Sequence, residues 1–219
     1  MAYDKQTIVR ISALMHEVKE RQESKQWTSA RYDTLAFQEL YAIVEAQLSL
    51  DRDEQTLHDS ITVLSFLAEG YRRIGRPTFS AQMYTALLWI ISEYKQKYAG
   101  EVEDIGDIFY RALETRNIYM DDPCSDLTPV GYILMDKENV DRMVRERMAR
   151  PRFLKRDPVE TTEAYLAVID EVEELVEKNR TTRGMGSCHE VWMLQCKYLA
   201  ERGIRWKSLG EMNPGIMFD

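Results

Sequence analysis

The spacing of apolar residues is the feature that most restricts the fold of this chain. Apolar side chains recur every three or four residues through most of its 219 residues. In one such stretch the apolar positions are Tyr32, Leu35, Ala36, Leu40, Ile43, Val44 and Leu48. This spacing places the apolar side chains on one face of an α-helix, whereas a half-buried strand would show strict alternation of apolar and polar residues. The sequence therefore predicts an all-α protein of about eight helices.

Residues that start and stop helices indicate how these helices are connected. Asp51 or Asp53 can accept hydrogen bonds from the free amides of a helix that follows. That helix ends near Gly75, because glycine takes the left-handed conformation that other residues resist. Pro77 suits the first turn of the next helix, residues 77–98, whose apolar arc is wide enough to predict a central position. Short connections of this kind predict antiparallel hairpins, packed as a short array or an irregular bundle.

Composition limits the class of protein. The chain has only 10 Gly and 6 Pro, which argues against a turn-rich all-β fold. Its 3 Cys are too few for a disulfide framework and favour a reducing compartment. The longest uncharged stretch of the first hundred residues, 77–92, is shorter than the ~20 residues that a bilayer requires. We therefore expect a cytoplasmic protein without membrane contact.

The helical pattern stops between Asp121 and Asp136, where turn-type dipeptides follow one another. Loops longer than about 12–15 residues are uncommon, and many of them are functional. After residue 203 comes a tail too apolar to be left in water, so we expect it to pack across the domain or onto a partner. The prediction is one domain, 1–219, with a helical-hairpin array at 1–120, a loop at 121–136, C-terminal helices at 137–203 and the apolar tail at 204–219.

One hairpin carries a family resemblance. Large, small, aromatic and glycine residues follow a fixed order at Leu64, Leu67, Ala68, Tyr71, Gly75, Ser80 and Tyr84. This order resembles a tetratricopeptide repeat, over residues 64–88. Ser92 stands where the family has a later proline. The resemblance implies small residues at the contact of two helices, and a scaffold of helical-repeat type that binds proteins or peptides and performs no catalysis.

The C-terminal block resembles the endings of uncharacterised bacterial proteins. It consists of His189-Glu190-x-Trp192, Gly203-Ile204-x-Trp206 and Met212-Asn213-Pro214. This second resemblance implies no activity.

Metal-binding patterns are weak. Di-iron bundles need Glu three residues before His on two helices, but Ala13, Gln55 and Gly186 precede the three histidines at that distance. Met193 stands where a zinc-protease helix beginning at His189 would need its second His. Cys188 and Cys196 lie eight residues apart, or ~12 Å along a helix, too far to share one ion. We expect neither a metal nor another cofactor.

The segment around Ser187 offers two interpretations. Free amides at the start of a helix can bind an anion, and Gly184 to Ser187 approach such a start. Alternatively, Ser187 and Glu190 have the spacing of a capping box that only fixes the helix end. Cys188 and His189 would point about 100° apart on a helix, a poor arrangement for a nucleophile and its base. With no G-x-S-x-G, Walker or G-x-G-x-x-G motif present, the sequence favours a protein that is not an enzyme.

Charge is strongly segregated near the C-terminal third. Residues 142–156 contain seven basic residues and one acidic residue, whereas residues 157–177 contain eight acidic residues and no basic one. We expect the two segments to face each other, within one chain or across a dimer. The alternative is that the arginines hold a phosphorylated ligand. The net charge of −8 disfavours nucleic acid as a partner.

These observations lead to two function hypotheses. The first is a non-enzymatic interaction module that binds a protein or peptide, or a second copy of itself, through a helical groove and the apolar tail. Its 4 Trp, 12 Tyr and 11 Met supply large side chains for contact. The second is a small-molecule enzyme or anion-binding protein that uses residues 142–156 and 184–189. The predicted binding residues are Arg145, Arg152, Arg156, Ser187, His189, Trp192 and Trp206.

Overall fold

The computed structural model describes residues 3–24, 29–117, 126–149 and 154–218. Within these ranges the chain is mostly helical and contains no β-strand, which confirms the predicted all-α class. Contacts divide the chain into two compact units, residues 1–151 and 152–219, called here the seven-helix unit and the C-terminal unit. The expectation of one domain stays a prediction.

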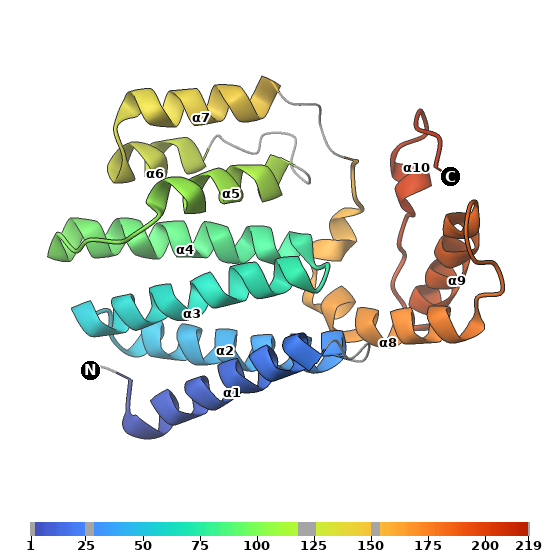
Figure 1. Cartoon of the computed structure of the whole chain (residues 1–219), viewed down its shortest axis with the longest axis horizontal. Coiled ribbons are helices and arrows are strands. Elements are labelled where there is room, and N and C mark those ends of the chain that lie inside the picture. Colours follow the sequence, from blue (N-terminus) through green and yellow to red (C-terminus); the bar gives the residue numbers. More distant parts are fainter. Residues whose placement is uncertain (1–2, 25–28, 118–125, 150–153, 219) are drawn as a thin grey trace. The chain divides into compact units, whose positions relative to one another are not determined.

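The seven-helix unit is built from helices that pack in chain order. They are α1 (Lys5–Ser24), α2 (Ser29–Leu50), α3 (Glu54–Arg73), α4 (Pro77–Tyr98), α5 (Ile105–Asn117), α6 (Leu127–Leu134) and α7 (Lys137–Ala149). Each of the first five contacts the next, and α6 and α7 close the array by packing against α4 and α5 (Figure 1). The packing is therefore repeat-like, as the hairpin pattern predicted.

The α3–α4 hairpin follows its sequence signals closely. The carboxylate of Asp53 accepts a hydrogen bond from the backbone amide of Thr56 at 2.9 Å and caps α3. Gly75 has φ +75° in the connection, and Pro77 is the first residue of α4. The Ser80 hydroxyl donates to the carbonyl oxygen of Ala68 at 2.7 Å, so the two helices approach closely where both residues are small. The predicted caps and the predicted helix contact are confirmed.

Buried side chains show that α4 is central to this unit. Twelve residues of α4 are buried, including Leu87, Leu88 and Ile91, which have 0% exposure. A helix with apolar residues on most of its circumference must be covered on several sides. Here α3, α5 and α6 all pack against it. The prediction of a central helix at residues 77–98 is confirmed.

The described chain has ten α-helices, against about eight expected from spacing alone. The first additional helix, α6, lies inside the stretch 121–136 that was expected to be a loop. Leu127, Val130 and Leu134 are buried at helical spacing, and Pro129 is tolerated because amides of a first turn have no intrahelical acceptor. The Thr-Pro-Val-Gly sequence therefore belongs to a helix start and not to a turn.

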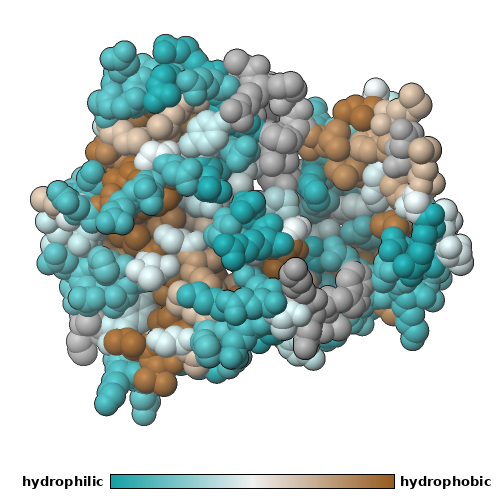
Figure 2. Space-filling model, in the orientation of Figure 1, coloured by the Kyte–Doolittle hydropathy of each residue, from teal (hydrophilic) through white to brown (hydrophobic). Residues whose placement is uncertain are grey.

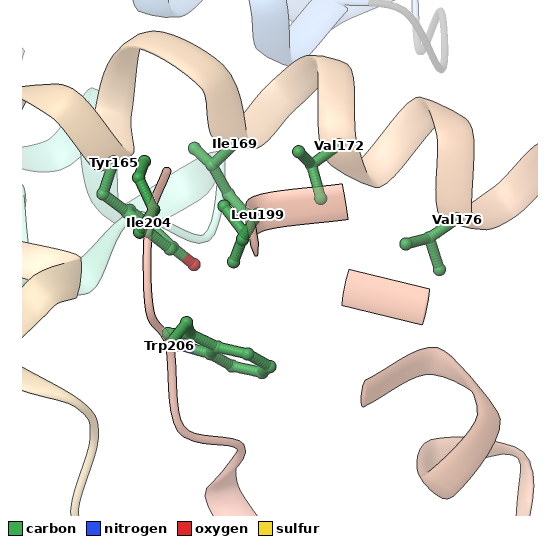
Figure 3. Close-up of a cluster of buried hydrophobic side chains, with 7 residues drawn as sticks. All are labelled: Tyr165, Ile169, Val172, Val176, Leu199, Ile204 and Trp206. Carbon is green, nitrogen blue, oxygen red and sulfur yellow. The ribbon is translucent and has the colours of Figure 1, made fainter. Parts of the chain in front are cut away.

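The C-terminal unit is a smaller helical assembly. Its elements are the 3₁₀ helix η1 (Pro158–Thr161) and the α-helices α8 (Glu163–Asn179), α9 (Ser187–Glu201) and α10 (Leu209–Met212), the second helix that spacing did not predict. A buried cluster joins α8, α9 and the chain that follows α9 (Figure 3). Its members are Tyr165, Ile169, Val172, Val176, Leu199, Ile204 and Trp206.

The apolar tail is partly packed within the C-terminal unit. Ile204 and Trp206 are buried in the cluster, and the Phe218 ring lies 5.0 Å from the Trp192 ring, edge to face. Ile216 and Met217 remain 49% and 92% exposed. Figure 2 shows hydrophobic residues grouped at the upper right, where α10 and the C-terminal end lie. Packing of the tail is thus confirmed for its first part, while a partner for its end stays a prediction.

Candidate functional site

The seven residues proposed for binding lie in different parts of the chain. Arg145 is exposed on α7 of the seven-helix unit. Arg152 lies outside the described residues. The other five belong to the C-terminal unit, where Arg156 precedes η1, Ser187, His189 and Trp192 are on α9, and Trp206 follows α9.

Arg156 and Trp206 both contact the carboxylate of Glu160. The Arg156 guanidinium lies 3.2 Å from Glu160 Oε2, and the Trp206 indole N–H donates to Oε1 at 2.8 Å. Glu160 is 4% exposed and Trp206 is 9% exposed. A buried carboxylate requires such partners, because an uncompensated buried charge is costly. The Trp206 hydrogen bond holds the chain after α9 against η1, and Arg156 pairs with the same carboxylate from the residues just before η1. That either residue binds a ligand stays a prediction.

The start of α9 differs from the expected capping box. The N-cap is Gly186, with φ 80°, and no side chain caps the helix. Glu190 instead accepts hydrogen bonds from the backbone amides of Thr181 and Thr182, at 2.9 and 2.6 Å, and from the Thr181 hydroxyl at 2.7 Å. The Thr181 amide is the largest cause lowering the pKa of Glu190 to about 2. The capping-box prediction is therefore wrong, because the loop before α9 offers this carboxylate several donors at once.

The two charged segments have their own partners. Arg147 of α7 is fully buried and lies 3.9 Å from Glu114 of α5, while Arg142 pairs with Glu146 on its own helix at 3.4 Å. On the acidic side, Glu171 pairs at 2.8 Å with Arg202, the residue that follows α9. The pair of Arg156 and Glu160 does join the basic segment to the acidic one. That the two segments face each other as a whole stays a prediction.

Titratable side chains do not gather into a reactive cluster in the part of the chain that is described. There, no group of three or more His, Cys, Asp or Glu residues is placed to hold a metal ion. Cys196 contacts the carbonyl oxygen of Trp206 at 3.6 Å, and burial raises the pKa of its thiol. A thiol with a raised pKa is less available as a thiolate. Cys124 lies outside the described residues.

The described residues of the seven-helix unit form a groove on its surface. It has a volume of about 550 Å³. We call it the α2–α4 groove, and define it by its lining residues: Tyr41, Val44, Glu45, Leu48, Ser49 and Arg52 from α2 and the residues after it, Leu64 from α3, and Ala86, Trp89 and Ile90 from α4. Its volume lies within the range of about 300–1,000 Å³ typical of ligand sites.

Helical periodicity explains why these side chains share the groove. On α2 the positions 41, 44, 45 and 48 are three or four residues apart, and on α4 the positions 86, 89 and 90 repeat the pattern. Leu64 of α3 lies between them and is 1% exposed. Trp89 is 50% exposed, although α4 is the central helix. The apolar spacing of residues 77–98 predicts a wide apolar arc, but only the order of the helices shows that the part carrying Trp89 is open to solvent.

The groove is lined by two charged side chains, Arg52 and Glu45, and within the described part of the chain only Arg52 is in an ion pair. Arg52 donates from Nε to Glu93 Oε1 at 2.9 Å and also bonds Oε2, and Lys97 adds a contact to Oε1 at 2.6 Å. The hydrogen bonds from Arg52 lower the pKa of Glu93 to about 2. Glu45 is exposed, and its carboxylate has no ionic partner among the described residues. The groove therefore combines an apolar surface with one cation that is already paired and one carboxylate that is not.

Comparison with known proteins adds no assignment. No protein-family model, curated protein or solved structure matches this chain. Among the described helices, none has both the length and the apolar character needed to cross a membrane.

Proposed function

We propose that this protein is a non-enzymatic interaction module that binds a segment of another protein in the α2–α4 groove. The observation that carries the proposal is an open groove of about 550 Å³ with a half-exposed tryptophan at its wall. Tryptophan and tyrosine dominate the binding energy of protein interfaces, and Trp89 and Tyr41 both line this groove. Burying a large, half-exposed side chain such as Trp89 against a partner removes apolar surface from water, and this lowers the free energy of the complex.

The architecture around the groove supports the same proposal. Helices that pack in chain order leave continuous concave surfaces, which helical-repeat proteins use for binding. The hairpin at residues 64–88 resembles a tetratricopeptide repeat, and that resemblance implies a protein- or peptide-binding scaffold. We place this activity in a reducing compartment such as the cytoplasm, because the chain has only 3 Cys, too few for a disulfide framework.

The proposal is tested by selecting peptides on the intact protein from a phage-displayed library of random 12-residue sequences. Enriched peptides should bind wild type and lose binding to Ala86→Arg, which places a long charged side chain in the groove. Arginine is a good helix former, so this change leaves α4 intact. The matched control is Tyr32→Ala, because Tyr32 is 57% exposed on α2 but does not line the groove. Peptides that bind Ala86→Arg as well as wild type would refute the proposal.

A further inference from the structure

The walls of the α2–α4 groove restrict the backbone conformation of its occupant. They are formed by α-helices, whose interior amides and carbonyls are already bonded within the helix. The hydroxyl of Ser49 also donates to a carbonyl of its own helix, from Glu45, at 2.7 Å. An extended peptide would bury unpaired amides and carbonyls against such walls, at a cost for each group. A helical peptide satisfies these groups internally.

The spacing of the apolar walls also fits a helix. Tyr41 and Leu48 are half-buried and lie on one ridge of α2, and half-buried Ala86 lies on a ridge of α4. Ridges of this kind receive side chains that repeat every three or four residues on a facing helix. From Tyr41 to Leu48 the ridge is about 10 Å long, given a rise of 1.5 Å per residue. It therefore matches about two turns of an amphipathic helix with anchors at positions i, i+3 or i+4, and i+7.

Glu45 restricts the charge of the occupant. An apolar side chain that covers this carboxylate would remove it from water without giving it a partner, which is unfavourable. A lysine or arginine at the edge of the occupant would pair with it. Arg52 does not compete, because both oxygens of Glu93 hold it. The net charge of −8 acts in the same direction by attracting basic partners over longer distances.

We infer that the occupant of the α2–α4 groove is a basic amphipathic helix of a partner protein, whose lysine or arginine pairs with Glu45. This inference rests on the proposed function, and it names the class of partner. The apolar face of the helix would pack between Tyr41 and Leu48 on one side and Ala86 on the other. Trp89 would pack over its exposed edge.

The test first selects helical peptides that bind the protein. It then measures how much the ion pair with Glu45 contributes to their affinity. A phage-displayed library of 14-residue peptides has alanine and glutamine at its fixed positions and is randomised at five positions on one face of the helix. Peptides that bind the wild-type protein are enriched from this library. The most enriched peptide is synthesised, together with a version whose basic residue is glutamine. Dissociation constants of both are measured on wild type, Glu45→Gln and the control Glu23→Gln, which removes an exposed carboxylate from α1.

The expected result is a basic residue in the selected peptides and about five-fold weaker binding to Glu45→Gln, with no change for Glu23→Gln. Replacing the basic residue of the peptide should weaken binding to wild type and have no effect on Glu45→Gln. Peptides that lose affinity for Ala86→Arg but bind Glu45→Gln as tightly as wild type would overturn this inference while leaving the proposed function in place. Enrichment of peptides that are all insensitive to Ala86→Arg would overturn both.

Discussion

Replacing Gly70 by alanine sets two effects of opposite sign against each other. Gly70 lies in the interior of α3, where alanine is normally favoured by about 1 kcal/mol. A Cβ atom at this position, however, would lie 2.4 Å from Cζ of Phe37 and 2.9 and 3.0 Å from its two Cε atoms. The glycine thus allows α2 and α3 to approach with an aromatic ring between them.

The packing of Phe37 decides which effect is larger. Phe37 is 0% exposed, and its ring meets Phe66 and Tyr71 edge to face at centroid distances of 5.9 and 4.9 Å. The ring has no free space to move into, so the new methyl group overpacks the core at a cost of up to about 3 kcal/mol. Subtracting the helical preference leaves Gly70→Ala less stable than wild type by about 2 kcal/mol.

Urea unfolding, followed by far-ultraviolet circular dichroism, measures this difference. With a slope of about 2 kcal/mol per molar, the midpoint should fall by about 1 M. The background Phe37→Leu provides the control, because a smaller side chain there should make Gly70→Ala neutral or stabilising. If Gly70→Ala stabilises the protein in the presence of Phe37, the close approach of α2 and α3 is refuted.

Three further predictions concern helix ends, ion pairs and the C-terminal unit. Ala99 caps α4 with φ 51°, so Ala99→Gly should raise the free energy of unfolding by about 1 kcal/mol; a loss in urea unfolding would contradict the left-handed conformation. The pKa of Glu93 falls from its ordinary value of 4.5 to about 2 in the folded protein. The stability that wild type has over Glu93→Gln should therefore be constant above pH 5 and disappear as the pH falls from about 4.5 to about 2; a difference that does not change with pH would exclude the ion pair. Trp206→Phe removes the indole donor to buried Glu160 and should cost about 1–3 kcal/mol in urea unfolding, more than Trp192→Phe; equal losses would show that the hydrogen bond contributes nothing.

The fold was most predictable where single residues have one common structural use. Asp53 caps α3, Gly75 takes the left-handed conformation and Pro77 opens α4, because each of these roles depends on local backbone chemistry. Local chemistry was misleading where a residue has two uses. Pro129 stands in a helix start and not in a turn, and Glu190 binds a neighbouring loop and not its own helix end.

The candidate site was less predictable, because it depends on which helices are neighbours. The stripe that contains Val44 and Leu48 was predicted correctly as part of a helix, but a stripe does not show which part a neighbour covers. Trp89 has half of its surface exposed only because the parts of α2 and α4 around it stand apart. Trp206 shows the reverse case, in which a tryptophan chosen for binding is buried in a core.

Peptide binding in the α2–α4 groove is tested most directly by an amide nuclear magnetic resonance titration of the labelled wild-type protein with a selected 12-residue peptide. We expect the shifted resonances to belong to residues 41–52 of α2 and the adjoining turn and to residues 86–93 of α4, while those of α9 and the C-terminal end stay in place. Shifts confined to α9, to the chain after it or to the arginines of α7 would contradict this expectation.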